Sequence, residues 1–328
     1  MKFLKDPFLI SLIAVVIIAL NFPARGNVAV FFEYLSGIFV ALLFFVHGAL
    51  LSRKAIIAGI THWKLHLFIF CCTFILFPVI AYLLKPLFSP MFPAEIVAGV
   101  IYMALLPSTV QSSIAFTSIA KGNVPAAICS ASISNMAGVF LTPLLVNILL
   151  MKQVSGQSVS GFETITDTVV QILIPFVIGH LLYNSAGKWL STKKWITKTV
   201  DNGTILLVVF VAFGESVVSK TWDNISAWML VKLIILCTVI LAIVMVAIYF
   251  TSAKLGFNKA DRIAILFCGS KKTLANGLPM ARIIFTGLPI AGLILPIMIF
   301  HQIQLMVCSF LAQKFRKEAD SAPAELMH

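Results

Sequence analysis

Residues 268–277, which read CGSKKTLANG, interrupt a long apolar run with a glycine, two lysines and an asparagine. Lys271 and Lys272 stand roughly ten residues from the start of that run, near the middle of a membrane-length segment. A charged side chain at that depth costs at least ~2.5–3.5 kcal/mol and marks a functional site by default. Residues 106–113, LPSTVQSS, form a second polar, helix-breaking island in another apolar run. These two islands constrain the fold more than any other part of the chain.

The composition is that of an integral membrane protein. Of the 328 residues, 60% are hydrophobic and 11% charged, and the mean hydropathy is +1.04. Soluble globular chains carry roughly 45–50% apolar and about 25% charged residues, so a soluble enzyme is excluded. The net charge of +12 reflects 12 acidic residues against 24 Lys and Arg, and no nucleic-acid partner is needed to explain it.

Ten apolar runs are long enough to be transmembrane helices, because a hydrocarbon core of about 30 Å needs about 20 apolar residues. The runs lie near residues 7–22, 28–50, 66–85, 94–119, 123–150, 168–187, 203–219, 226–250, 260–286 and 289–312. The first run could be a signal peptide, but residues 21–25 offer no small-residue cleavage site, which favours a retained span. The predicted fold class is therefore all-α and integral to the lipid bilayer.

The basic residues orient the spans. With the N-terminus in the cytoplasm, about 16 of the 24 Lys and Arg fall in cytoplasmic segments and about four in external loops. Cytoplasmic loops of membrane proteins carry such an excess. We therefore expect a multi-pass protein of the plasma membrane, the inner membrane of a bacterium, with both termini cytoplasmic.

Neither a disulfide framework nor a cofactor is predicted. All six cysteines lie in apolar runs without metal-ligand spacing, so they are expected to pack as small hydrophobic side chains. The chain has no phosphate-binding glycine loop and no haem or zinc pattern.

The two polar islands occupy matching places in two halves of five spans each. Ser270 follows Ser108 by 162 residues, and the Gly/Pro turns that end the two interrupted spans, at 122–125 and 287–289, are offset by 164. Because five is odd, the halves run in opposite senses across the membrane. We predict an inverted five-plus-five repeat: the first repeat in residues 1–150, the second in 151–312, and a cytoplasmic tail in 313–328.

Paired interrupted helices in inverted halves are the best sequence pointer to a transporter's binding site. Unwound backbone in lipid costs several kcal/mol per unpaired group, so such a break is tolerated only where it faces protein or a wet cavity. The freed half-helix ends carry partial charges that can hold ions or charged groups. The alternative is a simple Pro/Gly kink whose Ser and Thr side chains bond back to their own helix.

The candidate site consists of the polar residues of the two breaks and of the spans beside them. They are Ser108, Thr109, Gln111, Ser112, Ser113, Ser130, Ser134, Asn135, Ser270, Lys271, Lys272, Thr273, Asn276, His301 and Gln304. One lysine could reach the crossing while the other binds freed carbonyls or an anionic substrate, or both could only plug the end of a half-helix. The histidine and the serines could equally be ordinary contacts between helices.

Four short sequence motifs are specific enough to indicate a protein family as well as a fold. They are LPSTVQSS at 106–113, GNV at 122–124, LTPLL at 141–145 and FCGSKK at 267–272. They closely resemble the bile acid:sodium symporter superfamily. Within it they are similar to the YfeH-type bacterial branch, which the vertebrate seventh member of solute carrier family 10 also resembles. The resemblance covers essentially the whole chain.

The resemblance implies ten helices in which the discontinuous fourth and ninth cross at their breaks. Helices 3–5 and 8–10 would form a core, and helices 1, 2, 6 and 7 a panel, with a substrate cavity between them. Sodium-coupled members use hydroxyl and amide groups of the fourth and fifth helices and an acidic residue in the ninth. The residues that match the first set, and so are the sodium candidates, are Ser112, Ser113, Ser130 and Ser134. Ser270 and Lys271 occupy the place of the acid.

No carboxylate is expected at mid-membrane, so a sodium site would have only neutral oxygens beside a repelling ammonium. We therefore hypothesise that Lys271 or Lys272 replaces the coupling sodium, with its protonation linked to transport. Sodium and the proton both stay open as the coupling ion.

The sequence thus favours a secondary transporter of an amphipathic organic anion, bile-acid-like, steroid-like or lipid-like, that works by alternating access. A membrane regulator or scaffold without transport is the alternative, and it gives no reason for paired breaks and midplane lysines. An intramembrane enzyme with Ser270 or Ser108 activated by a lysine is disfavoured, because adjacent residues on a helix point apart and no oxyanion arrangement is evident. The sequence does not indicate an oligomeric state.

Overall fold

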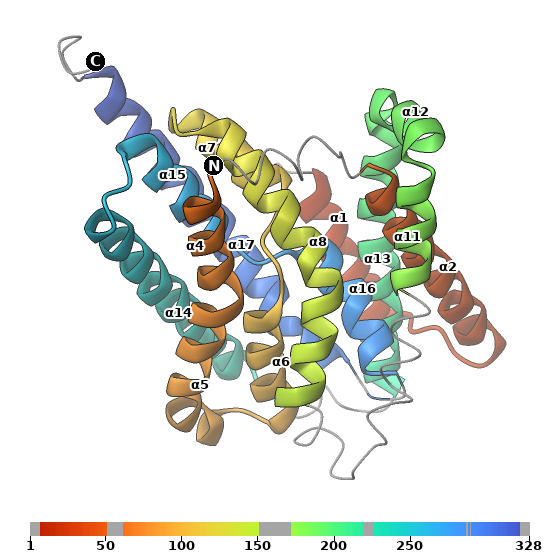
Figure 1. Cartoon of the computed structure of the whole chain (residues 1–328). Coiled ribbons are helices and arrows are strands. Elements are labelled where there is room, and N and C mark those ends of the chain that lie inside the picture. Colours follow the sequence, from red (N-terminus) through yellow and green to blue (C-terminus); the bar gives the residue numbers. More distant parts are fainter. Residues whose placement is uncertain are drawn as a thin grey trace.

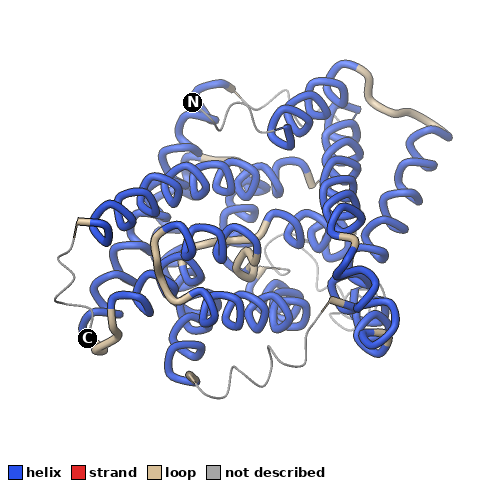
Figure 2. Tube along the Cα trace, turned by 90° about the horizontal axis from the view of Figure 1, so that it is seen from above, coloured by secondary structure: helices blue, strands red, loops and turns tan. Residues whose placement is uncertain are grey.

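The computed structural model describes residues 7–50, 62–150, 172–218, 226–286, 288 and 290–321. Every regular element in these ranges is a helix, and no strand occurs among them, as Figure 2 shows. The elements are α1 (Pro7–Asn21), α2 (Asn27–Ala49), α4 (Trp63–Cys71), η2 (Cys72–Leu76), α5 (Phe77–Phe88), η3 (Ser89–Met91), α6 (Ala94–Leu105), α7 (Gln111–Ile119), α8 (Val124–Leu149), α11 (Ile174–Leu181), η5 (Tyr183–Gly187), α12 (Lys188–Thr192), α13 (Lys194–Val218), α14 (Ala227–Lys254), α15 (Lys259–Gly269), α16 (Leu274–Ile284) and α17 (Ala291–Asp320). The all-helical prediction is confirmed.

Six helical stretches of the described chain are long and apolar enough to cross a membrane. They are Asn27–Ala49, Trp63–Met91, Val124–Leu149, Lys194–Val218, Ala227–Lys254 and Ala291–Asp320, and shorter apolar helices occupy Ile10–Asn21 and Ala94–Leu105. Large apolar side chains such as Leu83, Leu181 and Phe310 are more than 70% exposed, an arrangement that suits contact with lipid. The chain is a multi-pass membrane protein.

The helices form two packed groups, which Figure 1 shows on the right and on the left. On the right, α2 packs against α11, and α13 packs against α1 and α2. On the left and in the middle, α17 packs against α6 and α14, and α15 packs against α7 and α8. Helix α13 also contacts α16 and α17, so it joins the two groups.

Glycines bring α2 and α11 to backbone contact. A Cβ on Gly48 would lie 2.0 Å from the carbonyl oxygen of Phe176, and a Cβ on Gly179 would lie 2.0 Å from that of Phe45. Small residues allow such close approach, which drives helix association in lipid through van der Waals packing. The pair therefore depends on both glycines.

The two predicted helix breaks are confirmed. Helix α6 ends at Leu105 and α7 begins at Gln111, while α15 ends at Gly269 and α16 begins at Leu274. The predicted turn after the first broken helix is also present: the Gly122 N–H donates to the Thr117 carbonyl at 2.8 Å. Gly287 and Pro289 of the second predicted turn lie outside the described residues, as does the start of the predicted sixth span.

Two helix boundaries differ from the predicted runs by eight residues or more. Helix α13 begins at Lys194 rather than near 203, because its first turns are amphipathic: Lys198 is exposed and Val200 is buried. Helix α17 continues to Asp320, past the predicted end at 312, so the first part of the predicted tail is helical. Apolar content alone therefore located these two ends wrongly.

Candidate functional site

The two helix breaks touch each other. The Thr273 N–H donates to the Pro107 carbonyl at 3.0 Å, which joins the backbones of the two broken segments. Ser108 Oγ donates to the Cys268 carbonyl at 2.5 Å, and Ser113 Oγ donates to the Phe267 carbonyl at 3.0 Å. The side chains of the first break therefore satisfy carbonyl groups at the end of α15.

Side chains of α8 and α17 satisfy further backbone groups of the breaks. The Ser108 N–H donates to Ser134 Oγ at 3.1 Å. Gln304 binds the backbone of Lys272 on both sides: its Oε1 accepts from the Lys272 N–H at 2.9 Å, and its Nε2 donates to the Lys272 carbonyl at 2.8 Å. Buried backbone groups in lipid need such partners. Gln304 and Ser134 therefore supply hydrogen bonds that the unwound backbone of the breaks would otherwise lack.

Lys272 is fully buried, and its ammonium group donates to three backbone carbonyls. The acceptors are Thr73 at 2.8 Å, Ala104 at 2.8 Å and Leu106 at 2.7 Å. The ammonium also lies 4.3 Å from the ring centroid of Phe77. Because an ammonium has three N–H donors, all of them are used, and the lysine acts as a tethered cation within a ring of carbonyl oxygens.

Two of these three carbonyls, those of Thr73 and Ala104, lack their usual helical donor for identifiable reasons. Element η2, between α4 and α5, is a π-turn, in which the Phe77 N–H donates to the Cys72 carbonyl. In that register the Thr73 carbonyl would accept from residue 78, and Pro78 has no N–H. In an α-helix the Ala104 carbonyl would accept from Ser108, whose N–H goes to Ser134 instead.

Lys271 lies in a different environment. It is fully buried as well, but its ammonium group donates a long hydrogen bond, 3.4 Å, to Ser112 Oγ. The ammonium lies 4.2 Å from the ring centroid of Phe116 and 5.6 Å from that of Phe267. The two adjacent lysines therefore have separate surroundings, one of carbonyls and one of aromatic rings.

The four serines predicted as sodium candidates have different partners. Ser130 Oγ lies 2.6 Å from Nδ1 of His66, and Ser134 Oγ accepts from the Ser108 N–H. Ser112 and Ser113 both pair with the Thr109 hydroxyl, at 2.7 and 3.2 Å. Ser130 thus faces α4, and its hydroxyl is directed to a histidine that the sequence analysis did not select.

A cavity of about 270 Å³ lies where the breaks meet α13 and α2. Seven of the predicted site residues line it: Thr109, Gln111, Ser112, Asn135, Thr273, Asn276 and His301. The other eight do not line it; they are Ser108, Ser113, Ser130, Ser134, Ser270, Lys271, Lys272 and Gln304. In the second group, Ser108, Ser113, Ser134, Lys272 and Gln304 bind backbone groups at the crossing, whereas Ser130 pairs with His66 and Ser270 with its own helix.

Two polar groups of this cavity have a defined orientation. Asn276 is 1% exposed, and its Nδ2 donates to Asn135 Oδ1 at 2.6 Å. Gln304 Nε2 lies 2.9 Å from Nδ1 of His301. Since Gln304 Oε1 accepts from a backbone N–H, Nε2 is the amide donor, so Nδ1 of a neutral His301 accepts and its Nε2 carries the hydrogen.

The opposite wall of the cavity comes from residues that sequence reasoning missed. His47 of α2 and Lys198, Asp201 and Asn202 of α13 line it, and Nε2 of His47 lies 3.0 Å from Oδ1 of Asp201. Residues 198, 201, 202 and 205 follow the i, i+3, i+4, i+7 spacing of one helix face. Lys198, Asp201 and Asn202 are the polar members of this face. They could have been found from the sequence, but they were missed because the seventh span was predicted to start at 203.

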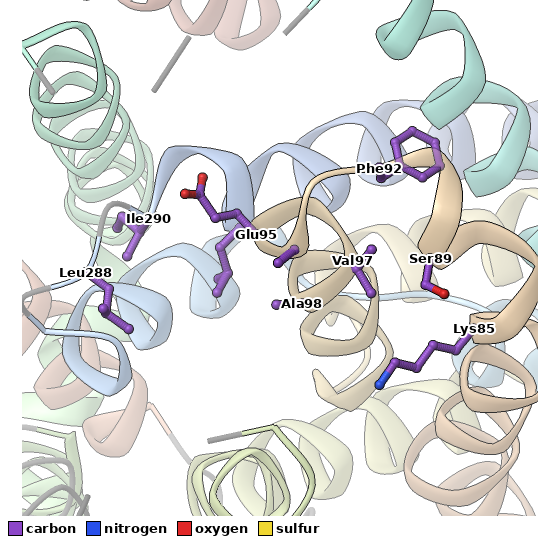
Figure 3. A pocket seen from close by; sticks show the side chains of 10 residues that line it. Lys85, Ser89, Phe92, Glu95, Val97, Ala98, Leu288 and Ile290 are labelled. Carbon is purple, nitrogen blue, oxygen red and sulfur yellow. The ribbon is translucent and has the colours of Figure 1, made fainter. Parts of the chain in front are cut away.

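A larger cavity, of about 420 Å³, lies where α5, η3 and α6 meet the start of α17 (Figure 3). Its described lining contains none of the predicted site residues. Figure 3 shows Lys85 and Ser89 on one side of the space and Leu288 on the other. We assign the candidate site to the smaller cavity, because residues of both helix breaks line it.

Arg282 near the end of α16 connects the two groups of helices. Its guanidinium lies 2.6 Å from Oε1 of Glu33 in α2 and 3.3 Å from Oε2 of Glu215 in α13. The Arg282 side chain is 15% exposed, whereas the two carboxylates are 60% and 46% exposed. The breaks, the cavity and this ion-pair cluster together connect α16 to both helices of the opposite wall.

Comparison with known proteins identifies the family. Residues 6–317 match the model of the SBF-like CPA transporter family. "Putative symporter YfeH" of Escherichia coli is 49% identical over 325 residues, covering 98% of this chain and 96% of that protein. "Uncharacterized protein PA2026" of Pseudomonas aeruginosa is 48% identical over 325 residues, covering 99% and 97%. "Sodium/bile acid cotransporter 7" of Rattus norvegicus is 30% identical over 279 residues, covering 84% and 81%. The resemblance predicted from the helix-break motifs is confirmed, and the chain belongs to the SBF-like CPA transporter family.

Proposed function

We propose that this protein is a secondary transporter of an organic anion that works by alternating access. One observation carries the proposal: the half-helices α7 and α16 both begin at a single cavity, whose other wall is α13. A cavity at two touching helix breaks, with polar residues of both breaks in its lining, is the arrangement expected of a transporter's binding site. The amphipathic, bile-acid-like or lipid-like character of the substrate stays a prediction.

The proposed membrane arrangement has ten spans. The broken pairs α6–α7 and α15–α16 each make one of them, and α4, η2 and α5 together make another. We keep the inverted repeats at 1–150 and 151–312, with a core of helices 3–5 and 8–10 and a panel of helices 1, 2, 6 and 7. The packing of α2 with α11 and of α13 with α1 and α2 supports the panel. Both termini would be cytoplasmic, in a bacterial inner membrane.

In this arrangement the structure is inward-facing. His47 and Lys198 line the cavity near the predicted cytoplasmic ends of their helices. At the opposite, predicted external side, Arg282 binds Glu33 and Glu215 and so holds α16 against the panel. Outward opening would require these ion pairs to separate.

We further propose that Lys272 takes the place of a coupling sodium. Three carbonyl oxygens that could coordinate a cation already accept hydrogen bonds from its ammonium group. The four serine candidates have separate partners, and Asp201, the carboxylate lining the cavity, is paired with His47. These residues fit sodium poorly, so the coupling ion would be a proton or absent.

The hydrogen bonds of Ser108, Ser270 and the two lysines are evidence against a Ser/Lys enzyme. Ser270 Oγ donates to the Leu266 carbonyl at 2.6 Å, and Ser108 Oγ donates to that of Cys268. The ammonium of Lys272 is held by carbonyls, and that of Lys271 has Ser112 as its hydroxyl partner. Neither lysine is therefore directed at either serine as a base. A scaffold without transport stays the alternative and predicts no solute binding.

The test begins with purified protein in detergent. We expect taurocholate, gluconate or hexanoate to raise the unfolding temperature with or without sodium, and the stabilising anion to enter proteoliposomes with saturable kinetics. No stabilisation and no flux with any organic anion would contradict transport. Flux that requires sodium and is indifferent to Lys271→Ala and Lys272→Ala would refute the role given to the lysines. Labelling of Ser270 by a serine-reactive activity probe would favour the enzyme.

A further inference from the structure

Backbone N–H groups at the starts of two helices lie beside the cavity at the breaks. Helix α7 begins there at Gln111, and among the described residues no side chain caps it. Helix α16 begins there at Leu274, and its cap is a long hydrogen bond of 3.5 Å from the Asn276 N–H to Thr273 Oγ1. The first turns of helices leave N–H groups without intrahelical partners, and two such ends facing one space favour an anion.

Charged and polar side chains add to these donors. Lys198 lines the cavity, and the ring of a neutral His301 carries its hydrogen on Nε2, because Nδ1 accepts from Gln304. The negative charge of Asp201 also faces the cavity, but His47 Nε2 lies 3.0 Å from its Oδ1. The balance of groups around the space therefore favours one negative charge in the ligand.

Asn276, which lines this cavity, has a buried acceptor without a partner. Oδ1 of Asn276 is buried and has no hydrogen-bond partner within the described part of the chain, while the Nδ2 atom of the same side chain is bound to Asn135. A buried acceptor without a partner costs about 1–3 kcal/mol. A ligand that brings a hydroxyl to this atom removes that cost, and a ligand without a donor does not.

We propose that the cavity binds a small carboxylate that carries at least one hydroxyl group. The carboxylate would lie at the starts of α7 and α16, near Lys198 and His301, and a hydroxyl would donate to Asn276 Oδ1. The volume of about 270 Å³ lies just below the ~300–1,000 Å³ of sites for drug-sized ligands, which suits a short-chain acid better than a steroid. This inference rests on the proposed transport function and narrows its substrate class.

The test compares matched probes on the full-length protein in lipid nanodiscs. Gluconate and hexanoate are six-carbon carboxylates with and without hydroxyls, glycerate and propionate are the three-carbon pair, and glucose is the uncharged six-carbon control. We expect each hydroxy acid to bind about tenfold or more tightly than its partner acid, and glucose not to bind. Asn276→Leu should abolish this preference. Asn276→Asp should weaken both acids but keep the preference, because it retains an acceptor and adds a negative charge.

The possible outcomes test the hydroxy-acid inference and the proposed transport function separately. Equal affinity for gluconate and hexanoate, or an unchanged ratio in a folded Asn276→Leu variant, would overturn the inference. If taurocholate binds and is transported while neither hydroxy acid competes with it, the inference fails and the transport function stands. If no organic anion binds, both fail.

Discussion

Removing the ammonium of Lys272 should leave a cation site that sodium can enter. In Lys272→Ala the carbonyls of Thr73, Ala104 and Leu106 lose their common donor, and the space left by the side chain lies between them. Carbonyl oxygens are the ligands that hard cations take up when they lose water. We therefore expect the stability of this variant, unlike that of the wild type, to depend on sodium.

The size of the effect follows from the contacts. A buried acceptor left without a donor costs about 1–3 kcal/mol, so three carbonyls together cost about 6 kcal/mol at the middle of that range. Removing a buried charge returns about 3 kcal/mol. The net loss of about 3 kcal/mol corresponds to a fall of about 6 °C in unfolding temperature, at the lower end of the shifts seen in large domains. Sodium present at about 30 times its Kd would restore about 2 kcal/mol.

The assay is thermal unfolding followed by tryptophan fluorescence in detergent, in sodium chloride against choline chloride at equal ionic strength and scan rate. Lys271→Ala is the matched control, because its ammonium lies over aromatic rings and has one long hydrogen bond to a hydroxyl. It should show no sodium response. Equal destabilisation of both variants, or a sodium response from Lys271→Ala alone, would refute the assignment of Lys272 as the resident cation.

Three further predictions concern the support of the site. Gln304→Leu should lower stability by about 2–6 kcal/mol, because the N–H and carbonyl of Lys272 both lose their partner; an unchanged unfolding temperature would contradict this. Gly48→Ala should cost about 1–3 kcal/mol by overpacking, while Gly37→Ala, with no atom within 4 Å of the new Cβ, should be neutral or slightly stabilising. Arg282→Gln should shift the population toward outward-facing states about fivefold, since two partly exposed ion pairs together give about 1 kcal/mol. An impermeant thiol reagent applied from outside, with a cysteine placed in the cavity, measures that shift; unchanged labelling would count against it.

The breaks could be predicted because their causes are local. Pro107 has no N–H, and a polar string around Lys271 and Lys272 cannot stay in lipid without partners, so both interruptions are visible in the sequence itself. Most of the selected residues lie in or beside these strings. The sequence could not divide them into those that face the cavity and those that hold the crossing, because that depends on where α8, α13 and α17 pack.

Other parts of the site depend on contacts between distant segments. The Thr73 carbonyl accepts from Lys272 only because a π-turn precedes Pro78, and a π-turn has no strong sequence signature. His66 meets Ser130 across α4 and α8, which are 64 residues apart at this contact. The face of α13 that contains Asp201 was a local signal, but it lay before residue 203, where the seventh span was predicted to start. Periodicity within the first turns of an amphipathic span would have been the better guide.

The hydrogen bonds at the crossing have a consequence for how the protein can move. The Thr273 N–H donates to Pro107, Ser108 Oγ donates to Cys268, and Tyr102 Oη donates to the Gly277 carbonyl at 2.6 Å. Groups freed by one break are therefore paired by the other half of the chain, and separating the halves would expose several unpaired groups at once. Each such group would cost several kcal/mol in lipid. The two broken helices should consequently move as one body. Alternating access should come from sliding of that body against α2 and α13, where the contacts include the cavity and the partly exposed ion pairs of Arg282, which water can replace.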